Sequence, residues 1–561
     1  MTPAPLLLSL LVISSSPSDA GVPLRGAAYF EARQAADRAY AERRYPAAES
    51  LYARLAGTSQ DVWVWFRLGQ SRVRQERYRA AVDAYGQALA LGTQRSREGS
   101  QNFMRYRMAR CYALAGERDS AIAWLDRAIA NGYEDRAEIA EDKSLASLHG
   151  DPRFDRLAGR LSAELTRDDG WRHDLAFLIA EIRRVHVRFR NEPLPPGFEA
   201  EARTLDREIP RLRDAEVLLR MQSLMVRLGD GHSVLYPGGE RVTMPALPVR
   251  LYHFADGWFV VETSDSLRSW LGRRVLAMGG VPMDTLARRL PPIVSRDNPM
   301  GIEWIGPLYF QLGDVLASLG ATRDPSRVRL TLEDRAGRRE DVVVRADRPL
   351  HPQAPKLGPP PSGSPPLWLR DAQRPFWLTP LPVPRALYLQ FNQVADADSE
   401  SLEGLALRLR TVLARDSIRD LVVDLRHNNG GDGDLLGELR RTLVWFTADD
   451  PRHRLFVLTG RGTFSAAQTF LNQIDHDTPA IVAGEPSSSR PDFPGEDTAL
   501  RLPWSGVHGS ISSRFHMVDG ADTRIWIAPQ IPVRLTVADY FGNRDPVLEA
   551  VLDVMRKDRS D

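Results

Sequence analysis

The chain has 561 residues, 43% of them hydrophobic, so it can bury several cores and we expect a multidomain protein. The charges of its 74 basic and 73 acidic side chains nearly cancel. The net charge therefore gives no overall attraction to nucleic acid or to an anionic membrane surface. A single cysteine, Cys111, cannot form an internal disulfide, so the fold must hold by packing alone.

The chain begins with a short apolar run over residues 5–13, followed by small residues up to Ala20. This pattern is typical of a secretory signal peptide over residues 1–20, although no Lys or Arg precedes the apolar run. An N-terminus without fixed structure is the alternative. No later stretch approaches the roughly 18 uncharged apolar residues that cross a bilayer, so no membrane span is expected. The sequence therefore predicts an exported protein, periplasmic or extracellular.

Residues 28–130 show helical patterns in which small and aromatic residues recur about every 33 positions. Ala48 and Tyr52 are repeated as Ala81 and Tyr85, and a third copy begins near Ala109. Small residues are needed where two helices cross closely, and roughly three units make a stacked core, so we predict tetratricopeptide-like repeats. Such a stack could present a concave face to a protein partner. A helical cap on the rest of the chain is an equal alternative.

Residues 131–170 are predicted to be a helical connector, and residues 171–240 a second helical segment. In this segment Leu175, Leu178 and Ile182 follow a helical period. The segment ends at Leu228-Gly-Asp-Gly-His232, where two glycines around one aspartate favour a turn. We therefore expect His232 to be displayed on a loop.

Short strands dominate residues 241–348. The stretch 271–283 resembles the strand-turn-helix entry of a PDZ domain, a module that captures extended peptides as an added strand. A structural β-domain without a ligand is the alternative. Residues 349–384 are rich in proline and predict a stiff, extended and unpacked linker.

Residues 385–556 alternate between apolar strand patterns and helical patterns, which predicts a mostly parallel sheet flanked by helices. The expected strands are 386–394, 420–426, 455–458 and 480–483, and the expected helices are 399–414, 435–445 and 465–474.

The strand over residues 421–425 runs into Arg426-His-Asn-Asn-Gly-Gly431. Gly430 and Gly431, at the carboxyl end of a parallel strand, would let main-chain N–H groups face a ligand with no side chain in the way. An oxyanion hole requires this arrangement. A plain glycine turn is the alternative.

A later strand leads to Ser465-Ala-Ala467 at the start of a predicted helix. A serine at that position is most often an N-cap. The positive end of the helix dipole and the free N–H of Ala466 would, however, lie beside its hydroxyl. The helix dipole and this N–H group favour Ser465 as a nucleophile.

The only lysines, Lys143, Lys356 and Lys557, fall in the connector, the linker and the last residues of the chain. None is placed to activate Ser465, so its base must be a histidine, and His232 is the candidate. A neutral imidazole with a pKa near 6.5 is suited to take the hydroxyl proton and return it to a leaving amine.

Five motifs of this chain, and their order along it, resemble those of the tail-specific, or carboxyl-terminal processing, serine peptidases and their tricorn-like relatives. The resemblance spans roughly residues 174–555, and it implies a crotonase-like α/β core joined to a PDZ-like domain and a helical segment. The motifs are Leu228-Gly-Asp-Gly-His232, Asp424-Leu-Arg-His-Asn-Asn-Gly-Gly431, Thr463-Phe-Ser-Ala-Ala467, Gly484-Glu-Pro486 and Arg544-Asp-Pro-Val-Leu-Glu549.

By this resemblance Ser465 matches the nucleophile, and Ala466 with Gly430 or Gly431 matches the oxyanion hole. One branch of the family uses a lysine beyond the serine, but the corresponding stretch here is Ser487-Ser-Ser-Arg490, and arginine stays protonated. The tricorn-like branch uses an upstream histidine, which His232 matches.

The third member of the triad is less clear. Tricorn-like members have a serine before the histidine, where this chain has Gly231, and a downstream glutamate that has no clear match here. Glu485 and Asp522 are the candidates for the residue that orients the imidazole.

The sequence therefore predicts a multidomain α plus α/β protein: helical repeats, a helical segment, a small PDZ-like β-domain and a catalytic core. Its predicted activity is that of a serine endopeptidase that cleaves a peptide or protein substrate through an acyl-enzyme. The alternative is a catalytically inactive scaffold of repeats and PDZ-like domain, favoured by Gly231, Gln468 and the missing third member. No metal-ligand or cofactor motif is present, so no metal, cofactor or nucleic acid is expected.

Overall fold

The computed structural model describes residues 26–57, 60–92, 101–130, 133, 136–159, 164–349 and 356–557. The chain divides into two compact units, Met1–Tyr133 with Asp142–His149, and Glu134–Glu141 with Gly150–Asp561. The predicted signal peptide lies outside the described residues. Within the described ranges, no helix combines the length and apolar character that a membrane span needs.

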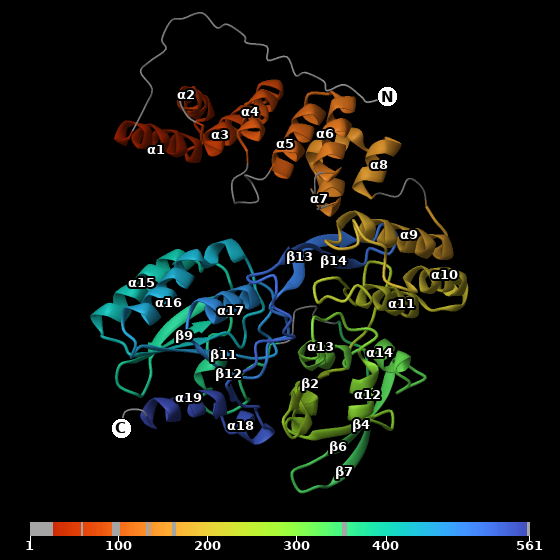
Figure 1. Cartoon of the computed structure of the whole chain (residues 1–561). Helices are drawn as coiled ribbons and strands as arrows, with labels where there is room; N and C mark the ends of the chain where they lie inside the picture. The colour runs from red at the N-terminus through yellow and green to blue at the C-terminus, as the bar shows by residue number, and fades with distance from the viewer. Residues whose placement is uncertain are drawn as a thin grey trace, which may run out of the picture. The chain divides into compact units, whose positions relative to one another are not determined.

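The first unit is built from consecutive helices (Figure 1). Ala48 and Ala81 are fully buried at the helix contacts, and a Cβ on Gly69 would lie 2.6 Å from the ring of Tyr85. The small residues thus allow the helices to approach closely. The interpretation of these helices as tetratricopeptide-like repeats stays a prediction. The helices are α1 (Ala27–Ala41), α2 (Tyr45–Ala56), α3 (Val62–Val73), α4 (Tyr78–Leu91), α5 (Gln101–Leu114) and α6 (Arg118–Ala130).

The second unit begins with α7 (Arg136–Glu141) and α8 (Pro152–Ala158), followed by α9 (Arg167–Val185), α10 (Phe198–Glu208) and α11 (Asp214–Val226). The apolar faces of α9 to α11 share one core with an antiparallel sheet that follows them in the chain. Leu178 of α9 and Leu218 of α11 are almost completely buried in that core. The loop that carries His232 leaves α11 and enters β1 (Val234–Leu235).

The antiparallel sheet has the strand order β2-β3-β4-β6-β7, with β5 paired to β4. Its strand β2 forms one edge, and α13 (Met300–Tyr309) lies beside this edge. The PDZ-like interpretation of this region stays a prediction. The strands are β2 (Val249–Phe254), β3 (Gly257–Thr263), β4 (Arg274–Met278), β5 (Val281–Pro282), β6 (Arg327–Glu333) and β7 (Arg339–Arg345), and two further helices are α12 (Met283–Arg289) and α14 (Gly313–Ser318).

A six-stranded sheet in the order β15-β12-β11-β10-β9-β8 forms the centre of the C-terminal region. All neighbours pair in parallel except β8 with β9, which confirms the predicted mostly parallel sheet. Helices α15, α16 and α17 cover one face and α19 covers the other (Figure 1). The strands are β8 (Phe376–Pro380), β9 (Ala386–Phe391), β10 (Asp420–Asp424), β11 (Arg454–Thr459), β12 (Ile481–Gly484) and β15 (Ile531–Pro532), and the helices are α15 (Leu402–Arg415), α16 (Gly437–Asp449), α17 (Ala466–Asp477), α18 (Val537–Phe541) and α19 (Pro546–Lys557).

The proline-rich segment differs from its prediction as an unpacked linker. Its residues 376–380 form β8 and pair with β9, and Trp368 and Leu369 are buried. The prolines stiffen the backbone, but the apolar residues between them still find a core. This correction places the end of the segment inside the central sheet.

A hairpin of β13 (Phe493–Arg501) and β14 (His508–His516) joins the helical segment to the central sheet region. Strand β1 pairs with β14, and the buried carboxylate of Asp174 in α9 accepts the N–H groups of Trp504 and Ser505 at 2.8 Å each. The hairpin therefore fixes the loop after α11 against the C-terminal region.

Arg426 ties the end of β10 to the start of α19. Its buried guanidinium donates to Asp545 at 2.8 Å through both terminal nitrogens and also bonds Asp424. The two carboxylates are themselves buried, so they depend on this cation for their charge compensation.

We predict that Arg426→Met lowers the free energy of unfolding by about 3 to 5 kcal/mol, because it leaves two buried carboxylates unpaired. Urea unfolding followed by circular dichroism measures the change. Arg452→Met is the matched control, since Arg452 pairs with Asp450 while 79% of its own side chain is exposed. The control should cost no more than about 1 kcal/mol. Equal effects of the two substitutions would contradict the assignment.

Candidate active site

Ser465 immediately precedes α17 in a backbone conformation that residues with a side chain rarely adopt. Its φ is 55° and its ψ is −125°, and its side chain makes no capping hydrogen bond to the helix. The interpretation of Ser465 as an ordinary N-cap is therefore wrong. Backbone strain of this kind costs about 1 to 3 kcal/mol and concentrates at functional sites, where surrounding structure enforces it.

The loop before Ser465 is held by hydrogen bonds to two neighbouring loops. The Thr463 hydroxyl donates to the Leu425 carbonyl at 2.9 Å, and the Phe464 N–H donates to the Asn428 carbonyl at 3.1 Å. The Ser488 N–H donates to the Thr463 carbonyl at 3.2 Å. These bonds hold the nucleophile loop against the end of β10 and against the loop after β12.

Both predicted glycines meet another part of the chain where a side chain would not fit. A Cβ on Gly430, whose φ is 110°, would lie 2.7 Å from the Cβ of Ser465 and 3.0 Å from the nitrogen of Ala466. A Cβ on Gly431, whose φ is 136°, would lie 2.1 Å from the carbonyl oxygen of Val394. Gly430 thus lets the end of β10 approach the serine directly.

The main-chain donors beside Ser465 are not equivalent. The Gly430 N–H donates to the side-chain oxygen of Asn428 at 3.0 Å, so it does not point freely at a ligand. The N–H groups of Gly431 and Ala466, in contrast, donate to no other group among the described residues. Of the three residues predicted to form an oxyanion hole, Gly431 and Ala466 therefore have an N–H available for a ligand. The N–H of Gly430 is bound to Asn428, and the lack of a side chain at this residue leaves space for Ser465.

His232 lies beside the nucleophile loop, but no hydrogen bond joins it to Ser465. Its ring is 3% exposed and is stacked between Phe464, at 4.3 Å between centroids, and Phe493, at 5.5 Å. Neither ring nitrogen makes a hydrogen bond of good geometry within the described part of the chain. Because Phe464 directly precedes Ser465, the structure brings His232 and Ser465 to neighbouring positions without a hydrogen bond between them.

Burial lowers the pKa of His232 to about 4, because the charged ring would lose its hydration. The carboxylate of Asp230 and the carbonyl of Pro494 raise this pKa, whereas His516 lowers it. The imidazole is therefore neutral at neutral pH and has a lone pair that can accept a proton.

Asp230 organises the loop that carries His232. Its carboxylate bonds the ring of His186 at 3.0 Å and the hydroxyl of Ser512 at 2.6 Å, and it accepts the N–H groups of His232 and Ser233. Burial alone would raise its pKa, but these bonds hold the pKa below the ordinary value. Asp230 is thus fully occupied in positioning the loop.

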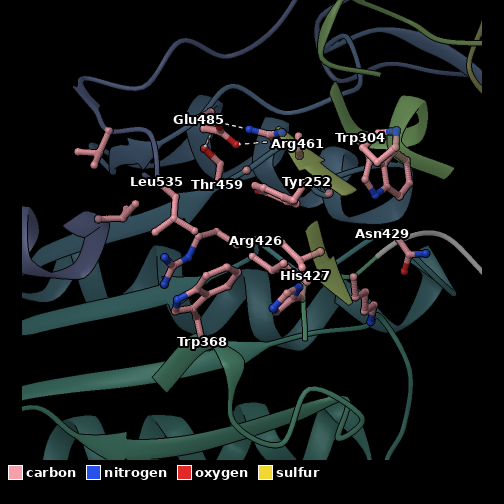
Figure 2. A pocket seen from close by; sticks show the side chains of 18 of the residues that line it. Tyr252, Trp304, Trp368, Arg426, His427, Asn429, Thr459, Arg461, Glu485 and Leu535 are labelled. Atoms are coloured by element: carbon pink, nitrogen blue, oxygen red, sulfur yellow. Dashed lines mark hydrogen bonds and ion pairs between the residues drawn. The ribbon is translucent and has the colours of Figure 1, made fainter. Parts of the chain in front are cut away.

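The two predicted orienting carboxylates lie elsewhere, which corrects that part of the sequence prediction. Arg461 binds the buried carboxylate of Glu485 through two nitrogens at 2.9 and 2.5 Å (Figure 2). Arg534 binds the same carboxylate at 3.3 Å. Asp522 is bound by Arg524 at 2.7 Å. Neither carboxylate makes a hydrogen bond to His232, and each compensates arginine charge instead.

A pocket opens between the antiparallel sheet and the carboxyl ends of β10 and β11 (Figure 2). Tyr252 and Trp304 lie on one side and Trp368 and His427 on the other, and Asn429 connects the pocket to the two glycines. Lys356, assigned to the linker in the sequence, also lines it. Sequence reasoning missed this because the packing of the proline-rich segment has no local pattern.

His427 in this pocket is a buried, neutral imidazole. Its ring stacks on Trp368 at 4.9 Å, and its Nε2 has no hydrogen-bond partner among the described residues. Burial, together with the charges of Lys356 and Arg426, lowers its pKa to about 3. Within the same described ranges, no three His, Cys, Asp or Glu side chains are grouped as a metal site would require.

Comparison with known proteins rests on structure, because no family model matches the sequence and no curated protein is similar to it. The structure of mature CPAF complexed with lactacystin is similar at a TM-score of 0.50, with 14% identity, over 70% of this chain and 98% of that chain. The photosystem II D1 C-terminal processing protease gives a TM-score of 0.32 with 12% identity, over 66% of this chain and 94% of that chain. Tricorn protease gives 0.31 with 10% identity, over 70% of this chain and 37% of that chain. At this identity the match to CPAF shows a shared fold and nothing more.

We predict that Glu485→Gln reduces stability but leaves the pH midpoint of serine acylation unchanged, because Glu485 serves Arg461 and not His232. Arg461 and Arg534 overcome the effect of burial and lower the pKa of Glu485. The stability contributed by its charge is therefore present at neutral pH and is lost as the pH falls through that lowered pKa. The difference in Tm between wild type and variant should accordingly shrink below about pH 4.5. A shifted acylation midpoint would show that Glu485 acts on the base after all.

Proposed function

We propose that this chain is a serine-type peptidase in which Ser465 is the nucleophile and His232 is the general base. The observation that carries the proposal is the strained backbone of Ser465 against Gly430, with two unused main-chain N–H groups beside its hydroxyl. An N-cap serine needs neither feature. A nucleophile that must meet both a substrate carbonyl and an oxyanion hole needs both.

In the proposed reaction the Ser465 Oγ attacks the carbonyl carbon of a peptide bond while His232 takes the hydroxyl proton. The N–H groups of Gly431 and Ala466 stabilise the negative oxygen of the tetrahedral intermediate. His232 then gives its proton to the amine as the C–N bond breaks, and an ester to Ser465 remains. Water, deprotonated by the same imidazole, then attacks the ester carbonyl, and the imidazolium returns the proton to the Ser465 Oγ as the ester C–O bond breaks and the carboxylic acid product leaves.

The Ser465–His232 pair must close before this reaction begins. In the structure the imidazole is stacked on Phe464, so a rotation of the imidazole or of Phe464 is needed to bring a ring nitrogen to the hydroxyl. Catalytic hydrogen bonds often form fully only when substrate is bound. The neutral ring is the form that can accept the hydroxyl proton once the pair has closed.

A catalytically inactive scaffold is the second candidate. The same stacking of His232 favours it, because a ring held permanently between Phe464 and Phe493 could not serve as a base. In that case the pocket beside Tyr252 and the helices of the first unit would be the functional surfaces. The signal-peptide pattern supports export in either case, and a peptide or protein would be the partner.

We predict that a fluorophosphonate probe labels the wild-type chain on Ser465. Ser465→Ala should abolish labelling, and His232→Ala should slow it by a factor on the order of 10⁴ or more, because the hydroxyl then lacks a base. Mass spectrometry of the intact protein measures the label. Ser487→Ala, which removes another buried serine hydroxyl, is the matched control and should label normally. An unlabelled wild type would support the scaffold.

We also predict that the labelling rate rises with pH and reaches its plateau below about pH 8, because the base is an imidazole. Protonated imidazole cannot accept the hydroxyl proton, so activity appears as the ring loses its proton. Burial lowers the pKa of His232 and moves this rise to lower pH unless a carboxylate holds the charge of the ring. The measurement is the labelling rate from pH 4 to 10. A rise centred near 10.4 would instead identify a lysine base.

A further inference from the structure

The segment between α12 and α13 (residues 290–299) contacts two loops of the proposed site. One is the base loop, residues 227–233, which carries His232, and the other is the loop after β12, residues 485–492. On one side the Ser295 hydroxyl donates to the Ser233 carbonyl at 2.6 Å. On the other side the Asn298 side chain donates to the carbonyls of Ser487 and Ser489 at 3.0 and 3.1 Å. Asp297 lies between these two attachments. The segment therefore holds a carboxyl group where the two halves of the proposed site meet.

The carboxyl group of Asp297 is buried, and only one of its two oxygens accepts a hydrogen bond of good geometry. It is 3% exposed, and its Oδ1 accepts the N–H of Gly231 at 2.7 Å. Its Oδ2 makes no hydrogen bond of good geometry within the described residues, although a side-chain hydrogen bond from Ser489 to this carboxyl group lowers its pKa. Ser489 in turn accepts the N–H of Ser465 at 3.5 Å. A buried carboxylate oxygen without a full set of partners requires an explanation, because such burial is costly.

The absence of a side chain at residue 231 makes room for this carboxyl group. A Cβ on Gly231 would lie 3.3 Å from Oδ1 of Asp297 and 3.0 Å from the ring of Phe464. Gly231 is adjacent to His232, whose ring nitrogens also lack partners. Phe464 therefore lies beside two adjacent residues of this loop. Gly231 contacts the Asp297 carboxyl group, whose Oδ2 lacks a partner of good geometry, and His232 carries the ring nitrogens that also lack one.

We propose, resting on the proposed peptidase function, that Asp297 is the positioning residue for His232 and supplies the carboxylate that fixes the imidazole when the Ser465–His232 pair forms. Glu485 and Asp522 are bound to arginines, and Asp230 is occupied in the loop, whereas Asp297 has an oxygen without a partner of good geometry beside that loop. Closure of the pair would bring a ring N–H to Oδ2 and leave the opposite nitrogen toward Ser465. A carboxylate in this position sets the tautomer and stabilises the imidazolium that forms during catalysis.

The charges around the two groups determine the expected pH dependence. Burial and the nearby charge of Asp230 raise the pKa of Asp297 to about 7, and the Gly231 N–H, Ser489 and Arg490 oppose this. His232 faces Asp230 and His516, and His516 faces Glu496. With one proton shared between Asp297 and His232, the base becomes available as the pair loses that proton near pH 7. Without the carboxylate, the base becomes available at the lower pKa of the buried ring.

The test compares the full-length wild type, Asp297→Asn, His232→Ala and the double variant, using the rate of fluorophosphonate labelling from pH 4 to 9. Asparagine keeps the acceptor for the Gly231 N–H but cannot hold imidazolium. We expect Asp297→Asn to slow labelling at pH 8 by up to about 10⁴-fold. We also expect it to shift the midpoint from near 7 toward 4, a change that a merely structural role would not produce. In the His232→Ala background it should have no further effect, because it acts through the imidazole.

Asp492→Asn is the matched control, since Asp492 also has a buried carboxylate oxygen without a partner but faces Asp519 and Asp522 instead. Its labelling rate and midpoint should equal those of wild type. Thermal unfolding from pH 4 to 7 gives a readout that does not depend on activity. Because the pKa of Asp297 is raised, its contribution to stability falls as the pH rises through 7, and Asp297→Asn should gain Tm relative to wild type over that range.

A wild-type rate and midpoint in Asp297→Asn would overturn the role of Asp297 and leave Ser465 and His232 as assigned. An equal slowing by Asp297→Asn with and without His232 would also overturn it. If His232→Ala labels as fast as wild type, the base assignment of the proposed function has failed, and the proposal for Asp297 fails with it.

Discussion

The close approach of Gly430 to Ser465 is the constraint on which the candidate site depends. There is no room for a side chain at residue 430, and Ser465, which lies against it, has a positive φ. This strain costs about 1 to 3 kcal/mol, whereas a typical hydrogen bond contributes about 0.5 to 1.5 kcal/mol. The three bonds that Thr463, Phe464 and Ser488 make around the loop can therefore offset it. The surrounding loops, and not the serine itself, hold the hydroxyl at the mouth of the site.

The architecture of the central sheet and the position of Ser465 could be predicted because their signals are local. Apolar runs identified β9 to β12 within a few residues, and alternation with helices indicated the parallel order. Gly430 and Ser465 each follow a strand of that sheet, and carboxyl ends of parallel strands meet at one edge. The sequence could therefore place them together without knowledge of any side-chain contact.

The contact of Asp297, the proposed carboxylate partner, could not be predicted because it is non-local. Gly231 and Asp297 are 66 positions apart, and nothing in either local pattern links them. Glu485 was a reasonable candidate from its place after β12, but its charge belongs to Arg461, a residue of the nucleophile loop. Likewise, the prolines predicted a stiff, unpacked segment at 349–384, yet they could not show that residues 376–380 pair with a strand of the sheet. Sequence patterns give periodicity and turns, whereas the choice of an ion-pair partner is decided by packing.

Arg461 adds a constraint from outside the central sheet. Its guanidinium binds Glu485 on one side and donates to the carbonyl of His253 at 2.9 Å on the other, and it lies over the ring of Tyr252. His253 and Tyr252 belong to β2 of the antiparallel sheet, while Arg461 belongs to the loop that ends at Ser465. A displacement of β2 must either break a hydrogen bond to a buried cation or carry the loop with it. Because a buried cation that loses its partners costs several kcal/mol, the geometry of Ser465 and the position of that strand are energetically linked.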